Sequence, residues 1–274
     1  MIFSGRFSKK AQQRFLKTLA HKIKGEKMNL LTKKDWDNIL ANNPEMISAI
    51  RYGSSLKNLK KAKDIDLFLV YAQNPTHKTS TYKNKFLFDI NQASVQETYS
   101  KIQAWDIDFT EPFLTGETIK GLKDTEKNVK DYLLNNKPTS QAIDYIKKRS
   151  IESLIQTEQL LAQTKYALLI DKVNKNQDSK TIKQDILRLQ EQNITIPSFS
   201  VALNQLNYAL SYAASAKRYE KKQTPITFND LINNPENKIE ELLLETRTYQ
   251  KDKSPKNLQD FVQYYKKAEG LIKR

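Results

Sequence analysis

The short stretch from residue 64 to residue 70 leaves this chain few structural choices. It reads Asp-Ile-Asp-Leu-Phe-Leu-Val, an apolar run that opens with two aspartates. A run this short and this apolar predicts a buried β-strand. Because successive side chains alternate between the two faces of a strand, Asp64 and Asp66 share one face and the aliphatic residues line the other. Two neighbouring carboxylates at a buried site repel each other, so we expect a cation between them.

A glycine and a serine end the preceding segment. Residues 49–52 have the alternation of a strand, and Gly53, Ser54 and Ser55 follow it as a turn. A glycine lets backbone N–H groups approach a phosphate closely, and the hydroxyl group of Ser54 adds a donor. The chain of 274 residues has only six glycines, so a glycine directly before a serine at a strand end is informative.

The aspartates and serines of this motif can bind a cation only through oxygen atoms. The chain contains no cysteine, which excludes disulfides, zinc ribbons and thiol catalysis. Its two histidines, His21 and His77, stand alone in the sequence, so a histidine-centred metal site or a serine triad has little to draw on. Carboxylate oxygens select a hard ion, and Mg²⁺ is expected because it binds one or two carboxylates plus phosphates.

The motif as a whole resembles the signature of the nucleotidyltransferase superfamily, which includes polymerase β, polynucleotide adenylyltransferases, CCA-adding enzymes and antibiotic nucleotidyltransferases. The matching residues are Tyr52-Gly53-Ser54 and Asp64-Ile65-Asp66-Leu67, within residues 45–121. The resemblance implies an α+β catalytic domain with a mixed β-sheet flanked by helices. It also implies transfer of a nucleoside monophosphate from a nucleoside triphosphate (NTP) to an acceptor hydroxyl group, with release of pyrophosphate.

A third carboxylate is expected on the next strand, residues 85–90, which follows a polar loop. We expect this strand to pair with the first one in an antiparallel hairpin. If Asp66 faces Asp89 in that hairpin, Asp64 faces Asn91. The alternative third carboxylate is Asp106 or Asp108, because residues 105–109 also alternate like a strand.

The order of the remaining elements is similar to that of the kanamycin (aminoglycoside) type of nucleotidyltransferase. In that order the acid at position 89 is followed by Ser94 and a helix over residues 95–102. The resemblance implies that Asp64, Asp66 and Asp89 hold two Mg²⁺ ions about 3.5–4 Å apart.

The resemblance also gives roles to residues on either side of these acids. Gly53 and Ser54 are expected to bind the β- and γ-phosphates. The connector lysines are expected to neutralise charge on the leaving group, and Lys63 is the one assigned to the nucleotide; solvated loop residues are the alternative interpretation. These lysines are Lys57, Lys60, Lys61 and Lys63.

Beyond Gly121 the strand patterns give way to helical ones. We expect helices over residues 123–136, 139–173, 181–191, 200–219, 235–250 and 257–273. The predicted organisation is a catalytic domain over residues 1–121 and an all-α helical-bundle domain over residues 122–274. In the kanamycin type a helical glutamate of the second half is the general base, which makes Glu152 and Glu158 the candidates; a solvated helix face is the alternative for each.

The net charge of the chain indicates a class of binding partner but does not identify one partner. A formal net charge of +15 and a pI of about 9.6 favour an anionic partner, either nucleic acid or the NTP itself. A general enrichment in lysine and asparagine explains the same charge without a binding surface. The expected acceptor is RNA or a small molecule. The alternatives are an aminoglycoside or lincosamide nucleotidyltransferase, a protein adenylyltransferase of a toxin-antitoxin pair, and an inactive nucleotide-binding homologue.

The first 25 residues contain no acidic residue and have apolar residues at four-residue steps, which predicts a basic amphipathic helix. Packing on the catalytic domain is the expected role, and a transit peptide is the alternative. A second short helix is expected over residues 33–40, with Thr32 as its N-cap. No apolar run reaches the roughly 18 residues of a membrane span. We therefore expect a cytoplasmic protein without a membrane partner, and the resemblance suggests a homodimer.

Overall fold

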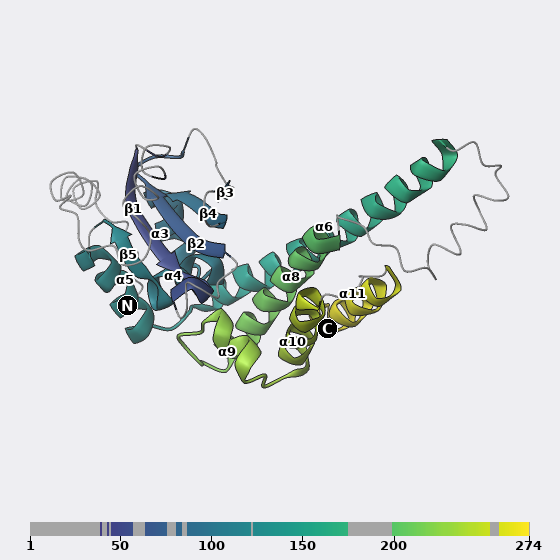
Figure 1. The fold of residues 1–274 in the computed structure, drawn as a ribbon. Coiled ribbons are helices and arrows are strands. Elements are labelled where there is room, and N and C mark those ends of the chain that lie inside the picture. Colours follow the sequence, from purple (N-terminus) through teal and green to yellow (C-terminus); the bar gives the residue numbers. More distant parts are fainter. Residues whose placement is uncertain are drawn as a thin grey trace. The chain divides into compact units, whose positions relative to one another are not determined.

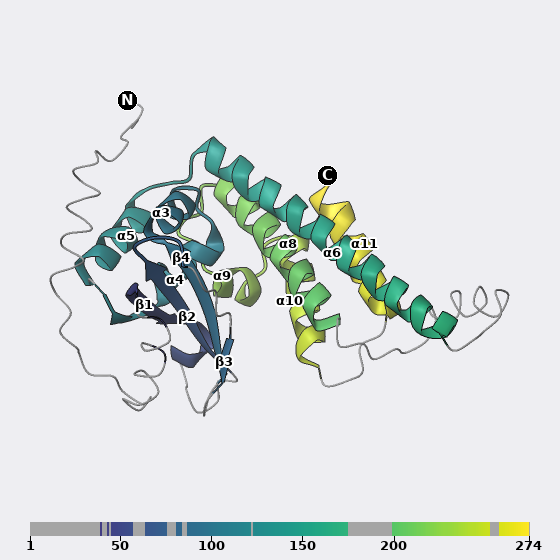
Figure 2. The ribbon, with the colours of Figure 1, turned by 90° about the horizontal axis from the view of Figure 1, so that it is seen from above.

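The computed structural model describes residues 39, 43, 45–56, 64–75, 81–83, 87–121, 123–174, 199–252 and 258–273. The chain divides into two compact units, Met1–Lys137 and Pro138–Arg274, and each is described by itself. Figures 1 and 2 show the elements of both units. The helix predicted over residues 1–25, the helix predicted over residues 181–191 and most of the one over residues 33–40 lie outside the described residues.

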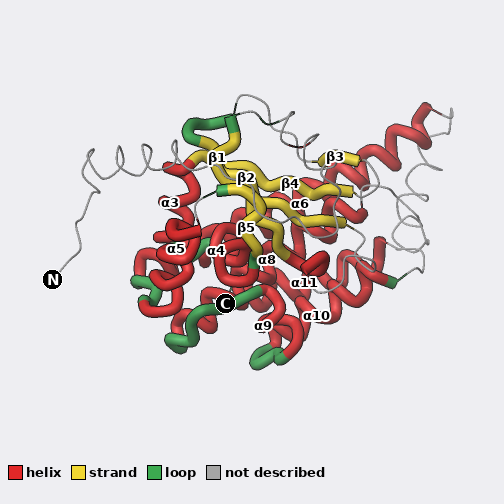
Figure 3. Tube along the Cα trace, turned by 60° about the vertical axis from the view of Figure 1, so that its left-hand side comes forward, coloured by secondary structure: helices red, strands yellow, loops and turns green. Residues whose placement is uncertain are grey.

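The first unit contains a five-stranded mixed sheet in the order β3-β4-β2-β1-β5 (Figure 3). The strands are β1 (Met46–Tyr52), β2 (Asp64–Tyr71), β3 (Thr81–Lys83), β4 (Leu87–Ser94) and β5 (Glu117–Lys120). Strand β1 is antiparallel to both β2 and β5, and β3 is antiparallel to β4. Strands β2 and β4 are parallel.

The predicted antiparallel hairpin between β2 and β4 is therefore wrong, although Asp66 does pair with Asp89. In the parallel register Asp64 faces Leu87 instead of Asn91. The chain between the two strands is long enough for a crossover connection, which parallel neighbours require. Part of that connection forms β3, which takes the antiparallel place beside β4 at the edge of the sheet.

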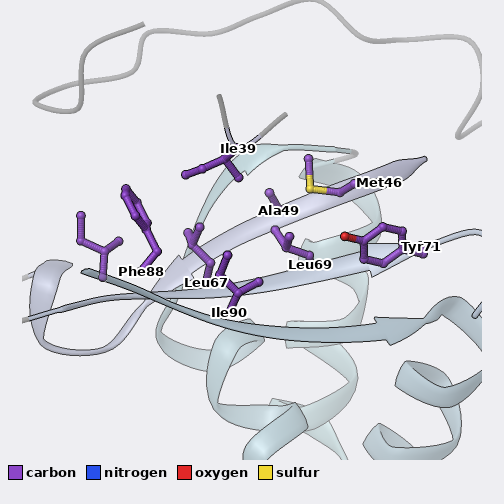
Figure 4. Packing of buried hydrophobic residues seen from close by; sticks show 9 residues of the cluster. Ile39, Met46, Ala49, Leu67, Leu69, Tyr71, Phe88 and Ile90 are labelled. Carbon is purple, nitrogen blue, oxygen red and sulfur yellow. The ribbon is translucent and has the colours of Figure 1, made fainter. Parts of the chain in front are cut away.

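One face of the sheet forms an apolar core, as the alternating apolar residues of β2 predict (Figure 4). Residues 65, 67, 69 and 71 of β2 all belong to this cluster, as the period of two requires. The full cluster is Ile39, Met46, Ala49, Ile65, Leu67, Leu69, Tyr71, Phe88 and Ile90, with Ile119 of β5 packed against it. Each such side chain contributes roughly 1.5–3 kcal/mol on burial, so this core fixes which face of β2 carries Asp64 and Asp66.

Helices pack on the opposite face. Helix α3 (Val95–Gln103) begins at Ser94, whose side chain accepts a hydrogen bond from the Glu97 amide as an N-cap. Helix α4 (Ile107–Thr115) follows. Phe68 of β2 makes edge-to-face contacts with two rings of α4, at centroid distances of 5.5 Å to Phe109 and 6.0 Å to Phe113.

The strand predicted over residues 105–109 is wrong, because Trp105 and Asp106 form the junction between these two helices. Trp105 has a φ of 56° and closes α3 by donating to the Ile102 carbonyl, while the Asp106 amide donates to the Lys101 carbonyl. These two bonds form a Schellman ending. Asp106 then caps α4 by accepting from the Asp108 amide. Alternating polar and apolar residues fit this cap as well as they fit a strand.

Helix α5 (Lys123–Asn135) belongs to the first unit, so the unit ends later than the predicted boundary at residue 121. Its Leu133 is fully buried, and the ring of its Tyr132 lies 6.4 Å from that of Trp105. Its Glu126 accepts a hydrogen bond from Ser48 of β1. Contacts with α4 and β1 therefore anchor this helix to the sheet.

The described elements of the second unit are all helices. They are α6 (Ser140–Asn174), α8 (Phe199–Glu220), α9 (Phe228–Asn233), α10 (Lys238–Lys251) and α11 (Leu258–Ile272). The short α9 was not predicted, and Thr227 caps it in a capping box with Asp230. None of the helices among the described residues has the length and apolar character needed to cross a membrane.

Within this unit, α6 and α8 lie side by side, as Figures 1 and 2 both show. Ser150 donates to the Ala209 carbonyl and Gln205 donates to Gln156, so the two helices are antiparallel. The other side of α8 packs on α10, where Arg218 makes a two-bond contact with the fully buried Glu240 at 2.9 and 2.8 Å. This ion pair fixes the start of α10 against the end of α8.

Candidate active site

The Gly-Ser turn lies directly against the second aspartate of the motif. Gly53 has a φ of +75°, a conformation that favours glycine, and a Cβ at this position would lie 2.0 Å from Asp66 Oδ2. The turn continues as a short 3₁₀ helix, Gly53–Leu56, in which Ser55 is buried and Ser54 is exposed. The sequence therefore needs a glycine here for two reasons, the backbone conformation and the space taken by the Asp66 carboxylate.

Three carboxylates share the face of the sheet opposite the apolar core. Asp64 and Asp66 lie at the start of β2, and Asp89 is in register with Asp66 on the parallel neighbour β4. Paired residues of parallel strands point to the same side, so all three acids lie on one face and at one end of the sheet. Asp89 is an exposed residue, but partial burial raises the pKa of its carboxyl group, and the charge of Asp64 raises it further.

These three acids are not spaced so that all of them could bind one metal ion. Among the residues that the structure describes, no three acidic or histidine side chains are spaced to hold a metal ion. Mg²⁺ requires only one or two carboxylates and takes its other ligands from water and phosphate. The oxygen donors at residues 64, 66 and 89 are of the type that suits this ion.

Tyr52 of β1 extends across β2 above these acids. Its Oη accepts a hydrogen bond of 2.6 Å from Asn91 Nδ2, although β2 separates the two strands in the sheet. Burial raises the pKa of Tyr52 well above its usual value, and the negative charges of Asp66, Asp108 and Asp89 raise it further. The hydrogen bond from Asn91 acts in the opposite direction. The phenol is thus a neutral group surrounded by carboxylates.

The two alternative acids have different surroundings. Asp106 is fully buried as the N-cap of α4, and its Oδ2 lies 3.8 Å from Lys101 Nζ. Asp108, in the first turn of α4, is close enough to Tyr52 for its charge to act on the phenol. The structure therefore gives Asp106 a capping position and brings Asp108 to the edge of the candidate site.

The remaining predicted site residues are outside this group. Lys63 and the other connector lysines lie outside the described residues. Glu158 is exposed on α6 in the second unit, where its charge is the second cause, after burial, of a Tyr265 pKa raised to about 12. Glu152 lies 3.6 Å from Arg149 and 4.0 Å from Lys148 on the same helix. The described contacts of both glutamates lie within the second unit.

Tyr52 and Asn91 are the two residues that the sequence analysis did not assign to the site. Tyr52 was counted only as the residue before the Gly-Ser turn. Asn91 is two positions after Asp89 on the same strand, so the period of two already places it on the same face. That both side chains meet above β2 depends on the strand order, which no local pattern contains.

Comparison with known proteins adds little to this geometry. No protein-family model matches the chain, and no curated protein matches it. Among solved structures, it is similar to a nucleotidyltransferase-like protein from Exiguobacterium sibiricum, with 14% sequence identity and a TM-score of 0.32. That match covers 88% of this chain and 73% of the other. The case for a function therefore depends on the residues of the site.

Proposed function

We propose that this protein is a Mg²⁺-dependent nucleotidyltransferase that moves a nucleoside monophosphate from an NTP to an acceptor hydroxyl group. The observation that carries the proposal is the juxtaposition of the Gly53-Ser54 turn, the Asp64 and Asp66 pair and Asp89 at one end of one sheet face. An isolated Gly-Ser or Asp-apolar-Asp pattern occurs in many proteins. Their contact through Gly53 and Asp66 is what supports a single site.

The donor set suits the ion that this reaction requires. Asp64, Asp66 and Asp89 provide only carboxylate oxygens, and their like charges on one face favour a divalent cation. In the proposal these three residues hold two Mg²⁺ ions, which when bound polarise the phosphoryl group and neutralise charge on the leaving oxygen. Gly53 leaves the backbone of the turn open to a phosphate, and the exposed Ser54 adds a hydroxyl donor.

The proposed reaction is an in-line displacement at the α-phosphorus of the NTP. A bond forms between the acceptor oxygen and this phosphorus, and the bond to the oxygen bridging the α- and β-phosphates breaks. Pyrophosphate leaves with the electron pair of that bond, and the hydroxyl proton passes to a carboxylate base. The resemblance to the kanamycin type offers Glu152 and Glu158 as candidates for this base; Glu158 is the one we select, and its role stays a prediction.

Charge favours an anionic acceptor. The net charge of +15 attracts RNA more readily than a polycationic aminoglycoside, which requires a local acidic pocket. An RNA 3′ hydroxyl group is therefore the acceptor class to test first, followed by small-molecule hydroxyl groups. Lys63, assigned to the triphosphate, belongs to the same proposal.

The test is a transfer assay with the full chain. The protein is incubated with Mg²⁺ and each labelled NTP in the presence of total RNA, aminoglycosides, lincosamides or protein, and both pyrophosphate and labelled acceptor are measured. We expect the wild type to release pyrophosphate in proportion to the labelled acceptor that it forms. Asp66→Asn should abolish both products, and Glu158→Gln should reduce both. Release of no pyrophosphate and labelling of no acceptor would refute the proposal and favour a nucleotide-binding protein without activity.

A further inference from the structure

The hydrogen bond between Tyr52 and Asn91 determines what the phenol can offer a ligand. The Asn91 amide is the donor in this bond, so the phenol oxygen is the acceptor. A tyrosine hydroxyl has one hydrogen of its own, and a phenol is neutral near pH 7. Because the oxygen of Tyr52 accepts the hydrogen bond from Asn91, its hydroxyl hydrogen can be donated to a ligand.

The surroundings of this hydroxyl indicate which acceptor it meets. Tyr52 is the cross-strand partner of Asp66, and its hydroxyl meets Asn91 on β4, so it lies beside the carboxylates on this face of the sheet. A phosphate brought beside these like-charged acids requires neutral or positive donors to offset repulsion. A neutral phenol can donate to a phosphate oxygen without the added cost of burying another charge.

We infer that the Tyr52 hydroxyl donates a hydrogen bond to a nonbridging phosphate oxygen of the NTP, and that Asn91 orients it for this contact. The inference rests on the proposed function, because it assumes that an NTP binds at this face. In this inference Tyr52 contacts the polyphosphate of the nucleotide, and not its base or its sugar. Tyr52 is thus a binding residue, and Asn91 is a positioning residue that acts through it.

The same sheet contains a matched control pair on its other face. Tyr71 of β2 donates a hydrogen bond of 2.5 Å to Asn43 Oδ1, within the apolar core. Tyr71→Phe therefore removes the hydroxyl of a tyrosine-asparagine pair from the same sheet, but on the face opposite Asp64 and Asp66. Any general effect of losing such a bond on folding appears in this variant.

The experiment measures binding by calorimetry of two probes with Mg²⁺, tripolyphosphate and NTP analogues with a methylene group between the α- and β-phosphates. We expect Tyr52→Phe to weaken binding of both probes by at least about tenfold, the loss of one hydrogen bond to a charged acceptor. Asn91→Ala weakens both probes less, and Tyr71→Phe changes neither. The double variant binds no more weakly than Tyr52→Phe alone, because Asn91 acts only through the phenol.

Each binding result that differs from these expectations refutes one identifiable claim. Wild-type protein that binds neither probe refutes the proposed function and this inference with it. Normal binding by Tyr52→Phe refutes the inference alone, and weakened analogue binding with unchanged tripolyphosphate binding refutes the phosphate assignment. Additive losses in the double variant refute the role of Asn91. If Tyr52→Phe does not fold by circular dichroism, Asn91→Ala decides, and unchanged binding by that variant overturns the inference.

Discussion

Glu126 of α5 is a carboxylate that the fold holds largely away from water. Ser48 of β1 donates a 2.7 Å hydrogen bond to its Oε1, and its Oε2 is buried without a hydrogen-bond partner. Burial raises the pKa of this carboxyl group from 4.5 to about 7, although the bond from Ser48 and the charge of Lys123 both act to lower it. The charged form of Glu126 is therefore unfavourable in the folded protein.

The consequence is a pH-dependent loss of stability with a definite sign. Below pH 4.5 the carboxyl group is protonated in both the folded and the unfolded chain, and the fold has its full stability. Between pH 4.5 and about 7 the unfolded chain releases the proton while the folded chain keeps it, so stability falls as pH rises. The full difference corresponds to roughly 3 kcal/mol, and about 2 kcal/mol remains after allowing for partial contact with solvent.

The perturbation is Glu126→Gln, which keeps the shape and the acceptor for Ser48 but cannot ionise. We expect this variant to match the wild type at about pH 4 and below, and to exceed its free energy of unfolding by about 2 kcal/mol at pH 8.5. Urea denaturation followed by tryptophan fluorescence is the assay. Both tryptophans, Trp36 and Trp105, lie in the first unit, so the signal reports on the unit that contains Glu126.

Asp131→Asn is the control, because Asp131 is an exposed acid on the same helix. It should show no comparable gain between pH 5 and pH 8.5. The reasoning is refuted if Glu126→Gln is less stable than the wild type at pH 8.5, or if the difference between them is independent of pH. Either result would mean that the carboxylate is ionised and well solvated in the fold.

Three further substitutions test the site and the helical unit. Gly53→Ala adds a methyl group against Asp66 and should cost about 1–2 kcal/mol of stability, with a loss of roughly 100-fold in kcat from displacement of the carboxylate. Gly270→Ala, whose added methyl group meets no atom within 4 Å, is its control, and equal losses in both variants would contradict this. Asp66→Asn should abolish the thermal stabilisation of about 2.7 kcal/mol that Mg²⁺ and NTP at 100 times Kd give the wild type. EDTA should abolish it too, and stabilisation that survives EDTA would exclude a metal role. Glu240→Ala removes the buried two-bond partner of Arg218, which keeps Glu236 at 3.5 Å, and should cost about 3 kcal/mol in urea denaturation. A loss below about 1 kcal/mol would contradict the assigned ion pair.

Helices α3, α5 and α8 were predictable because their signals are local. Ser94 caps the helix that begins at residue 95, and the expected ranges 123–136 and 200–219 correspond to α5 and α8 within one residue at each end. Polar breaks and apolar spacing mark such elements in the sequence itself. The junction at Trp105 and Asp106 was missed because a cap and a short strand share the same alternation.

The sequence by itself determined that Asp64 and Asp66 share one face of a buried strand and that a glycine turn precedes them, because the period of a strand and the freedom of glycine are properties of neighbouring residues. Only the tertiary structure decided that β4 runs parallel to β2, since strand direction depends on whether the connecting chain returns to the end of the sheet at which β2 begins. The same choice of strand order brought Tyr52 to Asn91. Contacts between residues far apart in the chain are selected by the packing of the whole core, and no local pattern records them.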